Sequence, residues 1–309
     1  MAINLWALAI ILTKLTLYIS FASLIGGFFV IWLFATQARG AAPRSNPFAL
    51  AQRLTFFLLI HSVLGLVSVT LFFLLQVGLI NQNGLAGMFD WFMSSIVMQS
   101  AIGQGSVLKA AGFVGFGLAA LALHYSLRYP QYSSFKLVSV FVLLLGVASA
   151  CAGFAELGHI VSLGVVEQWL IAIHVLAIAM WVGAFYPLML VSKTEPGATV
   201  HAFMKRFGDW GWLITVSLSV AGGYLLTQLL ASPLELINTA YGALLLLKVL
   251  LVLCLLGLAA LNKFRLVPAL LAAGPMPLAR SIKAEMGLAI LILIITAILS
   301  TVTGPAHLM

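Results

Sequence analysis

Apolar residues run along this chain in long stretches, separated by short segments that hold its turn-forming and charged residues. A transmembrane helix needs about 20 mostly apolar residues. The stretches that meet this requirement predict eight membrane-spanning helices, at about 5–35, 54–80, 105–127, 135–158, 167–191, 209–231, 240–262 and 283–303. The breaks between them contain typical turn residues: Arg39 to Pro47, Asn81 to Gly87, Arg128 to Ser134, Pro196, Pro233 and Pro268 to Pro277. The pattern therefore predicts an all-α, polytopic membrane protein with a single membrane domain.

The composition agrees with this prediction and narrows the function classes. Of 309 residues, 63% are hydrophobic and 7% are charged, whereas soluble domains carry about a quarter charged residues. A soluble enzyme and a disordered chain are therefore excluded. Cys151 and Cys254 both lie in apolar stretches, which favours neither a disulfide framework nor a CxxC metal site.

The net charge of +8 is informative because of where the basic residues lie along the chain. Twelve of the 15 lie in alternate connecting segments: Arg39, Arg44, Arg53, Arg128, Lys136, Lys193, Lys205, Arg206, Lys263, Arg265, Arg280 and Lys283. Because cytoplasmic loops of membrane proteins are enriched in Lys and Arg, both termini are expected outside. These residues mark topology, so the partner is the lipid bilayer and no nucleic-acid binding is expected.

The two halves of the chain resemble each other weakly. Ser100 and Gly103 precede Lys109 at the spacing at which Thr239 and Gly242 precede Lys248. Four helices per copy is an even number, which predicts a 4+4 parallel internal repeat with binding sites near the repeat interface. The expected units are 1–132 (helices one to three), 133–164 (helix four and an outer loop) and 165–309 (the second repeat).

A few polar residues interrupt the outer halves of the spans, where ionisable groups are functional candidates. Glu156 and His159 share one helical face because they are three residues apart. His174 follows in the fifth span, with Trp181 one heptad later, and His307 ends the eighth span on the same side. Imidazole groups bind copper, zinc, iron and nickel. The sequence thus predicts an outer metal site at Glu156, His159, His174 and His307, although each histidine alone is as well explained by packing or solvation.

Thioethers and lysines are weaker candidates on the same side. Met88, Met93 and Met98 could contact Cu(I), but an amphipathic interfacial helix is favoured for this segment. Lys14 and Lys109 are expected to reach the outer interface by snorkelling. The third lysine, Lys248, lies deeper; a buried carboxylate partner such as Glu156 or Glu235 and a direct functional role both stay open for it.

The order and spacing of several motifs resemble the CopD copper-resistance proteins, best over about residues 150–303. The motifs are Gly158-His159, His174 with Trp181-Val182-Gly183, Thr239-Ala240-Tyr241-Gly242 with Lys248, Ala259-Ala260-Leu261-Asn262, and Tyr18 with Gly26-Gly27. The resemblance implies eight helices in the bacterial inner (plasma) membrane, periplasmic termini and copper movement inward from the periplasm. It also implies a soluble periplasmic partner of the CopC type, and it assigns His159 and His174 to the family's histidine positions.

Two functions follow as alternatives. The first is a copper permease without enzymatic activity, in which copper enters at Glu156, His159 and His307, passes to His174 and continues between the repeats. The second is an oxidoreductase that holds haem b between axial histidines and acts on quinone or copper. A structural subunit without metal is a third, less informative possibility.

Overall fold

The computed structural model describes residues 4–37, 47–132, 134–156, 164–230 and 232–302. Within these residues the chain forms helices and no strand. The helices are α1 (Leu5–Gln37), α2 (Pro47–Asn81), α3 (Gly84–Gly87), α4 (Trp91–Met98), α5 (Ala101–Arg128), α6 (Ser134–Ala155), α7 (Val165–Val182), α8 (Phe185–Thr194), α9 (Gly197–Leu229), α10 (Glu235–Asn238), α11 (Ala240–Leu261), a π-helical segment (Asn262–Leu266), α12 (Val267–Ala273) and α13 (Met276–Leu299). Eight helical runs in this part of the chain are long and apolar enough to cross a membrane, which confirms the predicted all-α class.

Several helices extend beyond the predicted spans at the end that carries the basic residues. The sixth span was expected at 209–231, yet α9 begins at Gly197 and includes Lys205 and Arg206. The eighth was expected to begin at 283, and α13 begins at Met276. These boundaries were wrong because helical turns that project from the bilayer need no apolar residues, so hydropathy does not detect them.

The predicted break from Pro268 to Pro277 was also too long. The seventh helical run continues from Ala240 to Ala273, and Pro268 lies in the first turn of α12, directly after the π-helical segment. Proline lacks the N–H that the next hydrogen bond of this continuous run would use, and the π-helical turn directly before it marks where the hydrogen-bond pattern changes. The connection to α13 is reduced to Gly274 and Pro275, and Gly274 adopts a φ of 75°.

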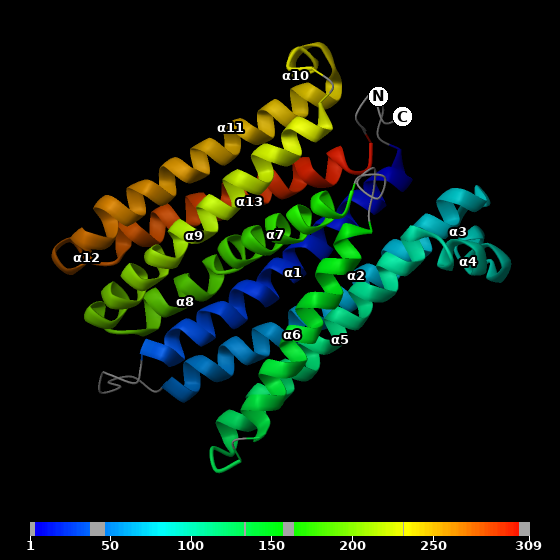
Figure 1. Ribbon diagram of the computed structural model, residues 1–309. Helices are drawn as coiled ribbons and strands as arrows, with labels where there is room; N and C mark the ends of the chain where they lie inside the picture. Colours follow the sequence, from blue (N-terminus) through cyan, green and yellow to red (C-terminus); the bar gives the residue numbers. More distant parts are fainter. Residues whose placement is uncertain (1–3, 38–46, 133, 157–163, 231, 303–309) are drawn as a thin grey trace.

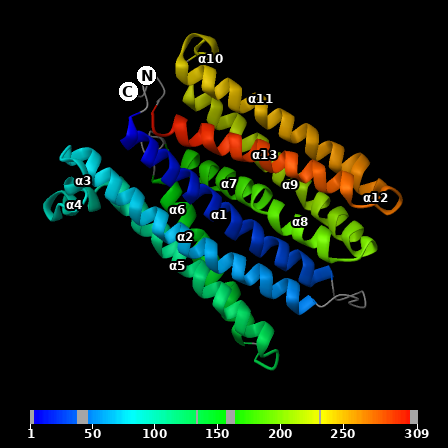
Figure 2. The same ribbon diagram turned by 180° about the vertical axis from the view of Figure 1, so that it is seen from behind.

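The start of α1 and the end of α13 lie at one end of the bundle together with α10 (Figure 1). The turns from α8 to α9 and from α12 to α13 lie at the opposite end, as Figure 2 also shows. A hydrogen bond joins the two terminal helices, because Lys14 Nζ donates to the Ser300 carbonyl at 2.6 Å. Which end faces the periplasm stays a prediction from the basic residues.

Helix α1 is the central element of the bundle. It packs against α2, α7 and α13, and 72% of its most apolar window is buried, compared with 11% for the run that contains α11. Two clusters of buried apolar side chains meet on it, one with α2, α5 and α6 and the other with α7, α8, α9 and α13. In addition, α6 contacts α7 and α13 contacts α1. These contacts join the two halves of the chain, and their relation as a repeat stays a prediction.

Glycines allow the closest approach between the two halves. A Cβ atom on Gly183 would collide with the backbone carbonyl of Ala22, and one on Gly26 would collide with the backbone of Gly183 and Ala184. Helices α1 and α7 therefore cross backbone to backbone, as small residues permit in membranes. The fifth span is interrupted at this crossing, since α7 ends at Val182 and α8 begins at Phe185.

Candidate metal site in the outer half

The predicted quartet of metal ligands is only half inside the described residues. His159 and His307 lie outside them. Glu156 lies just after α6, whereas His174 lies ten residues into α7. Among the described residues no three His, Cys, Asp or Glu side chains come close enough to hold a metal ion. Glu156 and His174 therefore do not form a shared metal group with a third such side chain in the described part of the chain.

His174 is packed against the backbone of α9. A Cβ atom on Gly222 would lie 2.8 Å from His174 Cε1 and 3.2 Å from Nδ1, so the imidazole occupies the space that this glycine leaves open. The ring also approaches the carbonyl of Leu218, one turn earlier in α9. Nδ1 is buried and makes no hydrogen bond with any described residue. Buried polar atoms are paired in more than about nine cases of ten, so this nitrogen is a candidate ligand.

Lys248 of α11 acts electrostatically on His174. Glu156, one of the two carboxylates expected as its partner, lies beside α5 instead. His174, Gly222 and Lys248 thus bring together α7, α9 and α11. The seam between α7 and α9 carries one more polar contact, from the Tyr224 hydroxyl to Glu167 Oε1 at 2.9 Å.

Glu156 belongs to a different polar group, between α5 and α6. It acts electrostatically on Lys109, and its Cβ lies 3.1 Å from the position that a Cβ on Gly105 would take. Lys109 is fully buried, donates to the Gly153 carbonyl at 2.9 Å and lies over the Phe154 ring. The snorkelling prediction is wrong for Lys109, because the glycines of the two helices leave room for its side chain between them.

Lys14 and Tyr18 gather at the end of α13. Lys14 is 7% exposed and donates to the Ser300 carbonyl, with Ser300 Oγ at 3.2 Å. The Tyr18 hydroxyl lies 3.4 Å from the same Oγ. Snorkelling is therefore wrong for Lys14 too. Both residues tie α1 to α13.

The remaining candidates have packing roles in the described structure. Trp181 is buried in the apolar cluster of α7, α8 and α9. Met88 is buried against Trp6 and Gly78, whereas Met98 is exposed and Met93 is half-buried in the short helix α4. Asp90 caps α4 by accepting from the Met93 amide at 2.8 Å. The segment forms a short helix, and its place at the membrane interface stays a prediction.

Sequence reasoning missed a buried carboxyl group in the other half of the bundle. Glu285 of α13 is 4% exposed and accepts a hydrogen bond from Asn262 Nδ2 at 3.0 Å. Its signal was available, because it is a carboxylate at the start of the last apolar stretch.

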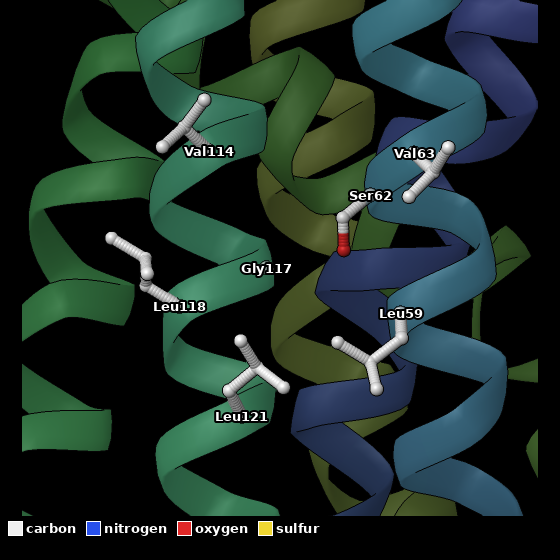
Figure 3. A pocket seen from close by; sticks show the side chains of 7 residues that line it. All are labelled: Leu59, Ser62, Val63, Val114, Gly117, Leu118 and Leu121. Atoms are coloured by element: carbon white, nitrogen blue, oxygen red, sulfur yellow. The ribbon is translucent and has the colours of Figure 1, made fainter.

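The described residues form at least two recesses between helices. The larger, about 250 Å³, is an apolar recess between α2 and α5; Figure 3 shows Ser62 as the one lining side chain with an oxygen, and that hydroxyl donates to the Leu58 carbonyl. The smaller, about 120 Å³, lies at the crossing of α1, α7, α8 and α13 and is lined in part by Ser23, Gly183, Tyr186 and Met286. The second lies on the seam between the halves.

Comparisons with known proteins bear on the identity of this bundle. Residues 201–299 match the family model described as copper resistance protein D, CopD. The copper transport protein CutJ of Bacillus subtilis (strain 168) is 29% identical over 224 residues, which is 69% of this chain and 39% of CutJ. The chain thus spans about two fifths of the length of this curated relative. No solved structure matches it. The chain is thus similar to the CopD family over residues 201–299 and to CutJ over 224 residues.

Proposed function

We propose that this membrane domain carries copper across the bacterial plasma membrane, importing it from the periplasmic side, and that His174 is a ligand on the path. The observation that carries the proposal is the buried, unpartnered Nδ1 of His174. It lies about 14 Å along α7 from the helix start at Val165, given a rise of 1.5 Å per residue. The CopD family match and the name of CutJ support copper as the substrate.

The path continues along the seam between the halves. From His174, helix α7 leads over nine further residues to Gly183, which lines the cavity that Met286 also lines. This cavity lies where the predicted repeats meet. Upstream, Glu156, His159 and His307 are proposed as entry residues, with copper delivered by a soluble periplasmic protein of the CopC type. The haem alternative gains no support, since the names of both matches refer to copper.

Transport by the purified chain tests the proposal. Proteoliposomes with a trapped copper chelator dye would receive external copper, as Cu(I) under reductant and as Cu(II) in parallel. We expect uptake by the unmodified protein and a loss of at least about tenfold in His174→Ala, the scale on which changes around a metal site reduce affinity or activity. His124→Ala is the matched control, because His124 is a half-buried histidine in the opposite half. Equal uptake in all three proteins would remove His174 from the path.

A further inference from the structure

A carboxyl group and an amide meet inside the bundle where α11 passes into the π-helical segment. Asn262 is the first residue of that segment, and its Nδ2 donates to Glu285 Oε2 at 3.0 Å. Glu285 is 4% exposed. Single π-helical turns inside α-helices are rare and occur frequently at functional sites. This pair, on α11 and α13, is separate from the candidate copper ligands of the outer half.

Two polar atoms beside this pair lack a partner. Asn262 Oδ1 and Ser281 Oγ are buried without a hydrogen bond to any described residue. Ser281 is 8% exposed and lies one turn before Glu285, on the same face of α13. An unsatisfied buried acceptor costs about 1–3 kcal/mol. Asn262 Oδ1 can only accept and therefore lacks a donor, whereas the Ser281 hydroxyl can donate or accept.

A protonated Glu285 supplies that donor. An ionised carboxylate only accepts hydrogen bonds, whereas the neutral acid carries one O–H donor. An acid and an amide side by side form a closed pair: the amide N–H donates to one acid oxygen, as Asn262 Nδ2 already does, and the acid O–H donates to the amide oxygen. The orphaned Oδ1 is the acceptor that this second bond requires.

Among the described residues, the basic groups near this end do not compensate a carboxylate. Lys263, also of the π-helical segment, is engaged elsewhere, because its Nζ donates to the Gly208 carbonyl at 2.7 Å. The other basic side chains on α13 and on the elements packed against it are either exposed or lie toward the opposite end of the bundle. Arg265, Arg280, Lys283 and Lys193 are exposed, and Lys14 and Lys248 lie in the half that holds the end of α13. Burying an unpaired carboxylate is costly, which again favours the protonated acid.

We propose that Glu285 and Asn262 form a proton-binding site in the half of the bundle that carries the basic residues. Glu285 takes up a proton from water as an O–H bond and releases it again, without any redox step. Met286, the next residue, lines the cavity on the seam between the halves. A coupling of this proton to copper movement rests on the proposed copper transport, whereas the proton site itself does not.

Infrared spectroscopy of the full chain in lipid nanodiscs tests the site without copper. A protonated carboxyl group gives a C=O stretching band distinct from that of a carboxylate. We expect this band at neutral pH in the unmodified protein and its loss in Glu285→Gln, where the amide side chain keeps the contact with Asn262. Glu167→Gln, which changes a carboxyl at the other end of the bundle, should retain the band. Asn262→Leu keeps the acid and should shift the band, because its amide partner is gone.

The outcomes separate this proposal from the copper proposal. Absence of the band in the unmodified protein, or a band unchanged in both Glu285→Gln and Asn262→Leu, would overturn the proton site. Loss of the band on adding sodium or magnesium at constant pH would also overturn it, because the oxygens would then bind a metal cation. A protein that shows the band and fails to move copper would refute only the proposed transport.

Discussion

The fit of His174 against Gly222 makes a quantitative prediction for Gly222→Ala. The added methyl carbon would lie 2.8 Å from His174 Cε1 and 3.2 Å from Nδ1. Ordinary carbon contacts are about 3.5–4.0 Å, so the ring must retreat by roughly 0.7–1.2 Å. Overpacking of this kind costs about 1–3 kcal/mol. We therefore expect Gly222→Ala to lower stability and to displace Nδ1.

The copper affinity of Gly222→Ala measures the effect of displacing Nδ1 of His174. If the whole cost falls on the bound state, affinity drops by about 5- to 150-fold, since each 1.4 kcal/mol is a factor of about ten. Competition with a copper chelator of known affinity measures this drop in detergent solution. The neighbouring residue supplies the control, because a Cβ on Gly223 meets nothing within 4 Å. Gly223→Ala should bind copper like the unmodified protein.

A double-mutant cycle separates the ring from other causes of destabilisation. When His174→Ala removes the imidazole, the methyl of Gly222→Ala has nothing to displace, so its cost in thermal unfolding should largely disappear. Interaction energies of about 0.5–3 kcal/mol are usual for residues in contact. An equal cost of Gly222→Ala with and without the imidazole would refute the packing of His174 described above.

Two further predictions concern the helix crossing and the nearby lysine. Gly183→Ala places a methyl against the Ala22 carbonyl of α1, and because this carbonyl belongs to the backbone it cannot move aside. The amount of folded protein that elutes in size-exclusion chromatography should therefore fall sharply. Gly257→Ala, whose methyl would lie in open space, should leave that amount unchanged. Lys248→Met removes a positive charge that acts on His174, so copper affinity in the competition assay should rise on the order of tenfold, and a fall would identify Lys248 as part of the binding site.

The spans were predictable from the sequence because the bilayer imposes their length and apolarity. The extension of α9 back to Gly197 and the passage through Pro268 were not, since water-exposed turns and a π-helical turn leave no hydropathy signal. Likewise, spacing alone placed Lys109 near the interface, whereas Gly105 and Gly153 of two packed helices create room for it inside.

The candidate site was predictable in part. His174 was identified as an ionisable residue in an apolar stretch, but its neighbours Gly222 and Lys248 come from α9 and α11, and no local pattern pairs those helices. Glu156 was grouped with His174 on shared sidedness, yet it lies beside Lys109 across α5 and α6. The side of the membrane that a residue faces gives only its depth along the bundle, and it does not determine which helices are neighbours.

The most direct test of the account is the metal and haem content of the purified chain after copper loading and removal of unbound metal, with His174→Ala measured in parallel. The account predicts bound copper in the unmodified protein, a clear loss of copper in His174→Ala, and no haem absorption in either. Equal copper in both proteins, or a reducible haem band in the unmodified protein, would contradict it.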